Sequence, residues 1–251
     1  MRFVRESYIV FRRQLRMNLR NPAWVIIGLM QPILYLLLFG PLLKPLINQF
    51  GAANAYTFFV PGMLVQLGLF GAFFAGFSLI GEWREGVIEA ERVTPASRTA
   101  LLVGRLARDM LQLLVQAMIL VALGYAIGMD ASVGGMVLGV LLTLLVGGAC
   151  AAASNALALT TKSEDVMAPV INVVMMPVLL LSGILLPMTI GPSWLQKASD
   201  FMPTRWVVDA TRSLFGGDLG DSSVIWGTGW ALVLFALAVW WGTATFRKEN
   251  A

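Results

Sequence analysis

The sequence predicts an all-α membrane protein with six transmembrane helices, and three observations lead to this fold class. The chain is 58% hydrophobic and only 13% charged, with a mean hydropathy of +0.77. Its apolar residues gather in six runs of about 20 residues or more, long enough for a helix to cross a bilayer. These runs are continuous, whereas the strands of a membrane barrel alternate. The expected spans are residues 23–43, 57–80, 110–129, 133–159, 166–187 and 224–243.

The basic residues predict how these spans are oriented. With the N-terminus inside, the segments on the inner side hold 14 of the 18 Lys and Arg residues; they are 1–22, 81–109, 160–165 and 244–251. By the positive-inside rule, both termini are expected in the cytoplasm of a cell (plasma or inner) membrane. The sequence pI of 9.6 therefore reflects topology, and no nucleic-acid partner is expected.

The N-terminal 22 residues are expected to form an amphipathic helix on the membrane surface, ended by Pro22. One face carries apolar side chains and the other carries arginines; these are Val4, Tyr8, Phe11, Leu15 and Leu19, against Arg5, Arg12, Arg13, Arg16 and Arg20. Such a helix buries its apolar face among the lipid headgroups. The alternative is an anchor that only sets orientation. Six arginines and no continuous apolar core exclude a cleavable signal peptide.

Small residues in the spans predict close helix packing. In the fourth span, "GGACAAAS" at 147–154 places Gly147 on the same helix face as Ala151, and Gly148 on the same face as Ala152, which is the small-xxx-small pattern of packed membrane helices. The second span, rich in Phe and Gly, offers either an aromatic wall for an apolar substrate or ordinary lipid-facing and core side chains.

Two short helices are expected on the outer side, before the sixth span. Ser193 is expected to cap one that runs to about Ser199, and Thr204 to cap another that runs to about Phe215. Their apolar residues, Trp194 and Trp206 among them, favour a position at the outer membrane interface, where Trp is common.

Catalytic motifs are missing from the sequence. It contains no phosphate-binding loop of the G-x-x-x-x-G-K-[ST] type, no zinc motif, no histidine, and a single cysteine, Cys150. Asp109, Glu164 and Asp165 fall at expected span boundaries, where water reaches them, so no intramembrane carboxylate pair marks a proton pathway. The chain is therefore not expected to be an enzyme, and no metal or cofactor is expected on it.

Three segments together resemble one family, the type-2 ABC exporter permeases. The charged loop supplies Glu82, Trp83, Arg84, Glu85, Gly86, Glu89, Pro95, Ser97, Arg98, Gly104 and Arg105. A downstream signature supplies Met176, Pro177, Ser182, Gly183, Pro187, Trp194, Leu195, Pro203, Asp209 and Arg212, and "FFVPGMLVQ" at 58–66 is the third match. The resemblance covers the whole chain as a single permease domain, 1–251. Within the family, the sequence most resembles the daunorubicin-resistance type of drug-export permease.

The resemblance implies a division of labour between subunits. A separate ATP-binding subunit, in two copies, would hold ATP and Mg and hydrolyse the ATP, while this chain and a second permease chain, identical or related, form the pathway. The implied function is export of a hydrophobic or amphipathic drug or antibiotic, with multidrug efflux and antibiotic resistance as its context. The alternatives are a lipid or glycolipid flippase of the same family, or a non-transporting membrane scaffold.

The resemblance also implies three sets of site residues. A coupling helix at 81–92 would dock on the ATPase through Glu82, Arg84, Glu85, Gly86, Glu89 and Arg92, with the three glutamates along one helix face. An external signature comprises Trp194, Pro203, Asp209 and Arg212, in which Asp209 and Arg212 are spaced to pair across one helical turn. An apolar path with a few polar points would be lined by Phe70, Phe74, Asn172 and Met175.

Overall fold

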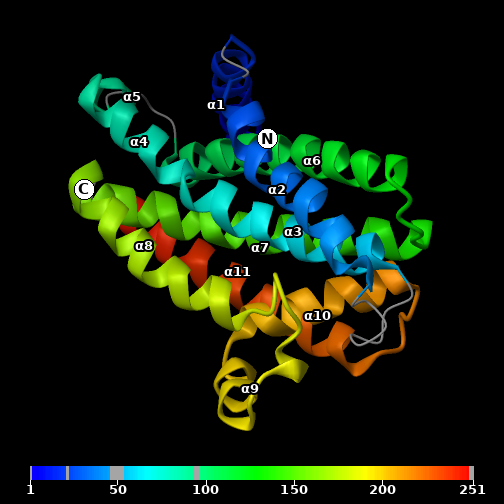
Figure 1. The fold of residues 1–251 in the computed structure, drawn as a ribbon. Coiled ribbons are helices and arrows are strands. Elements are labelled where there is room, and N and C mark those ends of the chain that lie inside the picture. Colours follow the sequence, from blue (N-terminus) through cyan, green and yellow to red (C-terminus); the bar gives the residue numbers. More distant parts are fainter. Residues whose placement is uncertain (1, 21–22, 46–53, 93–96, 249–251) are drawn as a thin grey trace.

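A computed structural model describes residues 2–20, 23–45, 54–92 and 97–248, and every regular element in those ranges is helical. The elements are α1 (Arg2–Arg20), α2 (Ala23–Leu43), α3 (Ala55–Phe73), α4 (Ala75–Arg84), α5 (Val87–Arg92), α6 (Arg98–Ala126), α7 (Val133–Thr161), α8 (Glu164–Leu181), the short 3₁₀ helix η2 (Met188–Ile190), α9 (Ser193–Asp200), α10 (Pro203–Gly216) and α11 (Ser222–Lys248) (Figure 1). The all-α class predicted from the sequence is confirmed.

Six helical segments are long and apolar enough to cross a membrane, as the hydropathy pattern predicts. They are α2, α3 continued by α4, α6, α7, α8 and α11. Two helix ends lie furthest from the expected span boundaries. α6 begins at Arg98, ahead of the span expected from residue 110, because Ser97 caps the helix there by accepting the N–H of Ala100. α8 ends at Leu181, before the expected end at 187, because the chain turns at Gly183, which has a φ of +73°.

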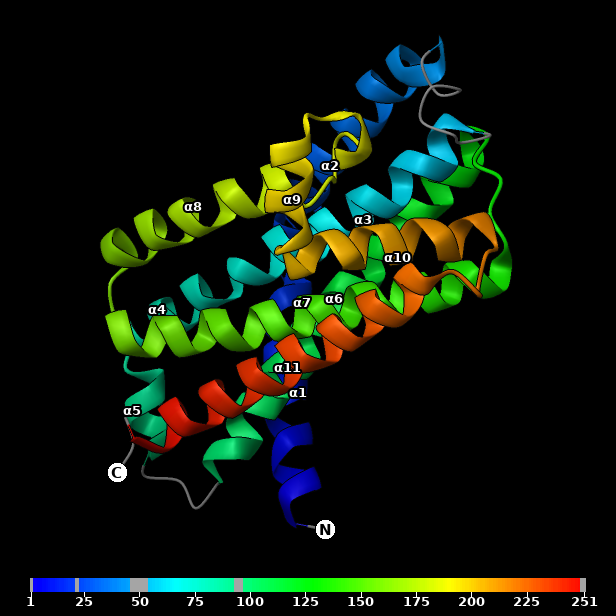
Figure 2. The ribbon, with the colours of Figure 1, turned by 90° about the horizontal axis from the view of Figure 1, so that it is seen from below.

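Helix α7 lies at the centre of the bundle, with α3 and α4 on one side and α11 on the other (Figure 2). Its small residues permit this position. A Cβ added to Gly68 of α3 would lie 3.2 Å from the carbonyl oxygen of Thr143, and one added to Gly148 would lie 2.9 Å from the ring of Phe235 on α11. The predicted close packing of 147–154 is therefore confirmed.

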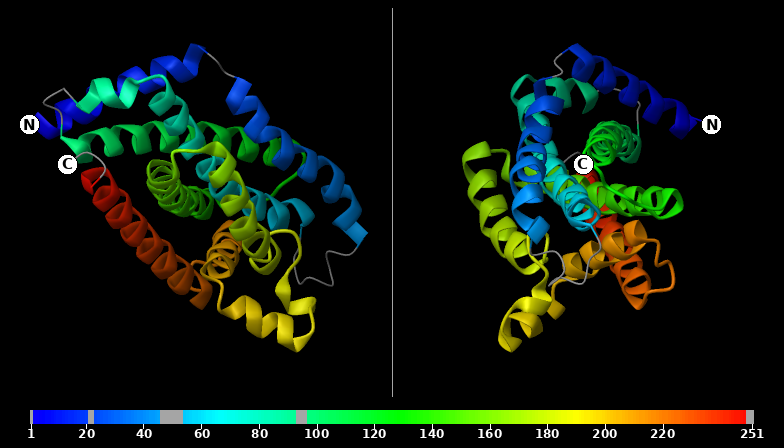
Figure 3. Two further views of the ribbon diagram at one scale, coloured as in Figure 1. Left: turned by 90° about the vertical axis from the view of Figure 1, so that its left-hand side faces the viewer. Right: turned by 45° about the vertical axis from the view of Figure 1, so that its right-hand side comes forward.

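The bundle has two distinct ends. The α1 terminus, α5 and the end of α11 lie together at one end, while α9 and the outer end of α2 lie at the other (Figure 3). We call these the α5 end and the α9 end.

The second span is broken at Phe74, although its sequence predicted an uninterrupted helix. α3 stops at Phe73 and α4 starts at Ala75. Ser154 of α7 repairs the break, because its hydroxyl donates to the carbonyl of Phe73 and accepts the N–H of Gly76 at 3.0 Å. A membrane helix tolerates such a break only where a neighbour satisfies the freed backbone groups.

The two short helices predicted near the α9 end are present, but their caps were wrong. α9 begins at Ser193 behind Pro192, whose carbonyl oxygen accepts the N–H of Leu195. α10 begins at Pro203, whose ring suits the first helical position, so Thr204 lies inside the helix and is buried.

Candidate functional site

The charged segment at the α5 end folds as two helices joined by a bend, the α4–α5 elbow (residues 75–92). α4 ends at Arg84, and α5 begins at Val87 after Gly86, whose φ is +73°. Glycine adopts this conformation at little cost, so Gly86 sets the bend. The single coupling helix expected over 81–92 is therefore wrong.

The three glutamates that were expected to share one face lie in different environments, and the bend at Gly86 separates only Glu89 from the other two. Glu85 and Glu89 are exposed, whereas Glu82 is buried. Arg84 is exposed as well. The side chain of Arg92 lies outside the described part of the chain, as do residues Pro22 and Pro95. Two of the expected coupling carboxylates are thus available to a partner, and the third belongs to the interior.

Glu82 joins three helices in what we call the Glu82 network (Gln14, Glu82 and Arg105). Its carboxylate accepts Arg105 Nη2 of α6 at 2.8 Å and Gln14 Nε2 of α1 at 2.6 Å. The side chains of Arg105 and Glu82 are 2% and 7% exposed. At such burial the ion pair is only weakly screened by solvent, so breaking it leaves an uncompensated charge.

A second polar group extends this network along α6. Arg108 lies 2.9 Å from the Asp109 carboxylate, and its guanidinium donates to Ser78 of α4 at 3.2 Å. Asn18 of α1 donates to Gln112 at 2.7 Å. Asp109 was expected at a water-exposed boundary, but its side chain is only 11% exposed, beside Arg108.

Helix α1 is anchored to the bundle at this same point. A Cβ added to Gly104 of α6 would lie 2.7 Å from the Cβ of Val10, so the glycine allows the two helices to cross closely. Glu6 accepts the N–H of Ser97 at 2.9 Å, directly at the start of α6. The arginine face and the Val4 and Tyr8 side of α1 stay exposed.

The elbow also contacts the connection between α7 and α8. Arg84 lies 3.0 Å from Glu164, with both side chains about half exposed, and the Lys162 ammonium lies 5.9 Å from the centre of the Trp83 ring. Movement of the elbow would therefore act on α1, α6 and α8 together. One side of the elbow is therefore fixed to the bundle, and Glu85 and Glu89 are exposed on its other side.

At the α9 end, Arg212 of α10 is the most connected residue of the external signature. Its Nη2 donates to the carbonyls of Gly183 and Ile184 at 2.8 and 3.0 Å, and its Nε donates to that of Phe58 at 3.3 Å. The guanidinium carbon lies 3.9 Å from the centre of the Phe58 ring. We call this the Arg212 cluster; it holds the turn after α8 against the first turn of α3.

Asp209 pairs with Arg212, as the three-residue spacing predicted, at 3.8 Å. It also lies 3.5 Å from Arg205, whose guanidinium donates to Ser199 and Asp200 of α9. Burial raises the pKa of Asp209, and Arg212 and Arg205 lower it in turn. Burial also lowers the pKa of Arg212 to about 10, partly offset by Asp209, so the guanidinium stays charged at neutral pH.

The remaining members of the external signature have separate roles. Pro203 starts α10, and Trp194 on α9 is 68% exposed. Trp206 donates its indole N–H to the carbonyl of Asp200 and lies beside Trp226 of α11. The exposed indole of Trp194 is therefore free for contact outside the chain, whereas Trp206 joins α9, α10 and α11.

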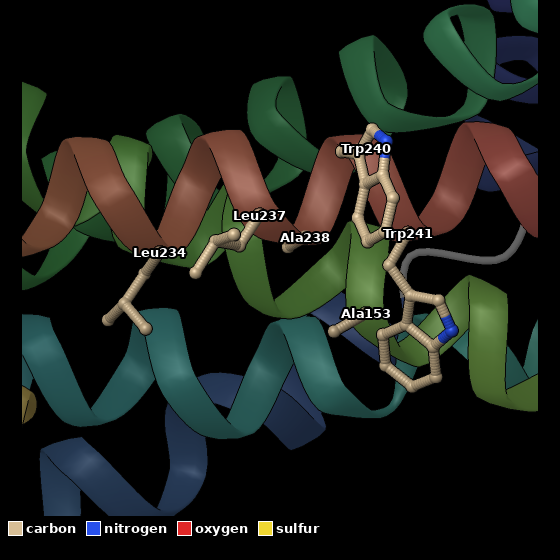
Figure 4. Close-up of a pocket in the computed structure, with 6 residues that line it drawn as sticks. All are labelled: Ala153, Leu234, Leu237, Ala238, Trp240 and Trp241. Atoms are coloured by element: carbon tan, nitrogen blue, oxygen red, sulfur yellow. The ribbon is translucent and has the colours of Figure 1, made fainter.

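The four expected path residues do not form one lining in the single chain. Met175 is buried with Ala72 and Leu79, and Phe70 packs against the same cluster. Phe74, at the break in the second span, is 52% exposed, and Asn172 is exposed on α8. An apolar groove lies elsewhere, between α7 and α11 (Figure 4).

Several residues of these sites were missed from the sequence, Gln14, Asn18 and Ser154 among them. Gln14 and Asn18 lie one turn apart on α1, a spacing that in hindsight marks a polar strip facing α6. Ser154 carried no such signal, since a serine in an Ala-rich stretch is ordinary. Among the described residues no group of three or more Cys, Asp or Glu could hold a metal ion.

Comparison with known proteins assigns the family. Residues 5–215 match the model of the ABC-2 type transporter family. The chain is 28% identical over 223 residues to the daunorubicin resistance ABC transporter permease protein DrrB1 of Streptomyces coeruleorubidus, covering 86% of this chain and 75% of that protein. It is also 28% identical over 212 residues to the putative transport permease ycf38 of Pyropia yezoensis, covering 82% of this chain and 70% of that protein. This chain belongs to the ABC-2 type transporter family.

Proposed function

We propose that the chain is the permease subunit of an ABC exporter in a cell membrane, with both termini in the cytoplasm. It moves a hydrophobic or amphipathic compound outward, driven by ATP hydrolysis on two copies of a separate subunit that binds ATP and Mg. A second permease chain completes the pathway. The similarity to a daunorubicin resistance permease supports a drug-like cargo.

The α4–α5 elbow is the observation that carries this proposal. It presents Glu85 and Glu89 to a partner, while Glu82 is locked to α1 and α6 behind them. A docking element must bind on one side and be rigidly held on the other, since a loose loop transmits no force. In this proposal Glu82 and Gly86 position the docking surface, and Arg84, Glu85, Glu89 and Arg92 belong to it.

The proposed path combines the break in the second span with the neighbouring face of α8. Phe74 and Asn172, both exposed in the single chain, would face the second permease chain across the pathway. Phe70 and Met175 would support this wall from behind. A mostly apolar wall with one polar amide fits an amphipathic cargo.

Reversal of the Glu85 charge tests the coupling role. We expect Glu85→Lys to weaken binding of the ATP-binding subunit or to leave hydrolysis without transport, because losing a desolvated interface charge costs about 2–5 kcal/mol. The measurement combines pull-down of the ATP-binding subunit with transport in membrane vesicles.

The matched control is Asp130→Lys, an equal charge reversal of an exposed residue at the opposite end of α6. Glu6 is unsuitable as a control because it accepts the N–H of Ser97. Equal behaviour of the Glu85 and Asp130 variants would show that the elbow does not couple the subunits.

A further inference from the structure

Gln66 of α3 is a polar side chain in the apolar interior of the bundle. It closes the segment "FFVPGMLVQ", it is 1% exposed, and its helical neighbours Met63 and Leu67 belong to the main apolar cluster. Neither atom of its amide, Oε1 or Nε2, has a hydrogen-bond partner among the described residues. A buried amide in this condition lowers stability, because its hydrogen bonds to water are lost and not replaced. Such a group points to a partner from outside the chain.

A second buried glutamine shows the ordinary arrangement. Gln116 of α6 is 2% exposed, and its Nε2 donates to the carbonyl oxygen of Val25 on α2 at 3.2 Å. That bond joins two spans, so the amide of Gln116 contributes to helix packing. Gln66 makes no such bond in the described part of the chain, and an apolar side chain of the same length would pack there equally well.

Helical spacing places Gln66 on one row of α3 with two residues of the proposed path. Phe70 follows it by four residues and Phe74, at the break, by eight, and residues four apart are neighbours on one face of a helix. Gly62 precedes Gln66 by four residues. There the turn after α8 lies against α3, since a Cβ added to Gly62 would lie 2.7 Å from the carbonyl oxygen of Ile184. Gln66 therefore lies along α3 between that turn and the aromatic residues of the path.

We propose that Gln66 is the hydrogen-bonding contact for the cargo within the path. This inference rests on the proposed export function and narrows its cargo. An amide offers a carbonyl oxygen and an NH₂ group but no charge, so it suits an uncharged carbonyl, hydroxyl or N–H group of an otherwise apolar compound.

Cargo reaches this amide when the turn after α8 moves away from Gly62. α8 suits such a movement, because only 17% of its most apolar window is buried. The cargo then supplies the hydrogen bonds that the chain does not. Because those bonds form only when Gln66 is uncovered, they favour the loaded arrangement over the empty one.

The unfolding temperature tests whether the amide is unpaired. Gln66→Met replaces it with an apolar side chain of similar length. We expect the unfolding temperature of the purified chain to rise by about 2–4 °C, because a buried polar group without a partner is removed. Gln116→Met is the matched control. It takes the donor from the carbonyl of Val25, so its unfolding temperature should fall.

Binding of two tricyclic probes tests the contact with cargo. Acridone carries one carbonyl and one N–H group, whereas anthracene has nearly the same shape and neither group. Each probe is titrated by fluorescence with the full chain in lipid nanodiscs, and empty nanodiscs of the same lipid correct for partition into the bilayer. We expect Gln66→Met to weaken acridone binding about fivefold, the effect of one ordinary hydrogen bond, and to leave anthracene binding unchanged. Gln66→Asn keeps the amide and should retain part of the preference for acridone, and Gln116→Met should retain all of it.

Two results would overturn the proposal. An unchanged or lower unfolding temperature in Gln66→Met would show that the amide is already satisfied in the empty chain. A higher unfolding temperature with an unchanged ratio of acridone to anthracene affinity would show a structural group that contacts no cargo. Neither measurement needs the ATP-binding subunit, so this contact can fail while coupling through Glu85 stands, and coupling can fail while this contact stands.

Discussion

Two largely buried arginines, one at each end of the bundle, have different kinds of hydrogen-bond acceptor. Arg105 at the α5 end pairs with the Glu82 carboxylate, so the contact joins two side chains. Arg212 at the α9 end takes three backbone carbonyls as acceptors, and its carboxylate partner is more distant at 3.8 Å. The contact of Arg105 depends on the identity of both side chains, whereas the contacts of Arg212 depend on the path of the backbone around Gly183.

This difference predicts which changes each end tolerates. A side-chain pair can be replaced as a pair, because removing both charges leaves neither charge buried without the other. The acceptors of Arg212 are backbone carbonyls, which no substitution can replace. Only the arginine itself can be changed, in shape or in charge. The Glu82 network is thus expected to set stability, and the Arg212 cluster to set the geometry of the α9 end.

The largest effect is expected from breaking the Glu82–Arg105 pair. Glu82→Ala leaves Arg105 buried without this carboxylate, and we expect a loss of about 3–5 kcal/mol in the free energy of unfolding. Thermal unfolding of the purified chain measures it. Glu82→Met with Arg105→Met should recover most of the loss, since apolar side chains of similar length replace both charges. An unfolding temperature unchanged by Glu82→Ala would refute the ion pair.

A smaller effect on stability, but a clear effect on transport, is expected at Arg212. Arg212→Ala removes charged hydrogen bonds, each with a net worth of about 1.5–3 kcal/mol. This figure is an upper guide to the loss, because Arg212 is only partly buried and water can reach the freed carbonyls. Export in vesicles should fall while the ATP-binding subunit stays bound in pull-down. Arg212→Lys keeps the charge but not the fork of donors, so it should fall between Ala and wild type.

Asp209→Asn is the matched control for this prediction. Asp209 is 38% exposed and its contact with Arg212 is long, at 3.8 Å, so its loss should lower export less than the loss of Arg212 does. An Asp209 variant as defective as Arg212→Ala would mean that the ion pair, rather than the carbonyl contacts, holds the turn after α8.

The smallest effect is expected at Arg84 and Glu164. Their contact, at 3.0 Å, is nearly as short as the buried one at 2.8 Å, but the side chains are 53% and 42% exposed. Solvent-exposed pairs contribute about 0–1 kcal/mol, so Arg84→Gln should barely change the unfolding temperature, and less so at high salt. A loss comparable to that of Glu82→Ala would show that burial does not separate the two pairs.

Transmembrane architecture was readable in the sequence because a bilayer imposes it locally. Each apolar run had to be long enough to cross the hydrocarbon core, and each such run is a helix in the structure. The small residues of α7 and the spacing of Asp209 and Arg212 were informative for the same reason, since helical geometry alone fixes which neighbours share a face.

Partners across helices could not be read in this way. Nothing local distinguishes Glu82, which is buried, from Glu85, which is exposed three residues later. Glu82 is buried because α1 and α6 meet there and supply Gln14 and Arg105 as its donors. Ser154 likewise acquires its role only because α7 passes beside the break at Phe74. Length, apolarity and spacing are properties of a segment, so the sequence by itself determined the spans. Burial and hydrogen-bond partners arise only where distant segments meet, so the tertiary structure alone decided which charges hold the bundle and which remain for a partner.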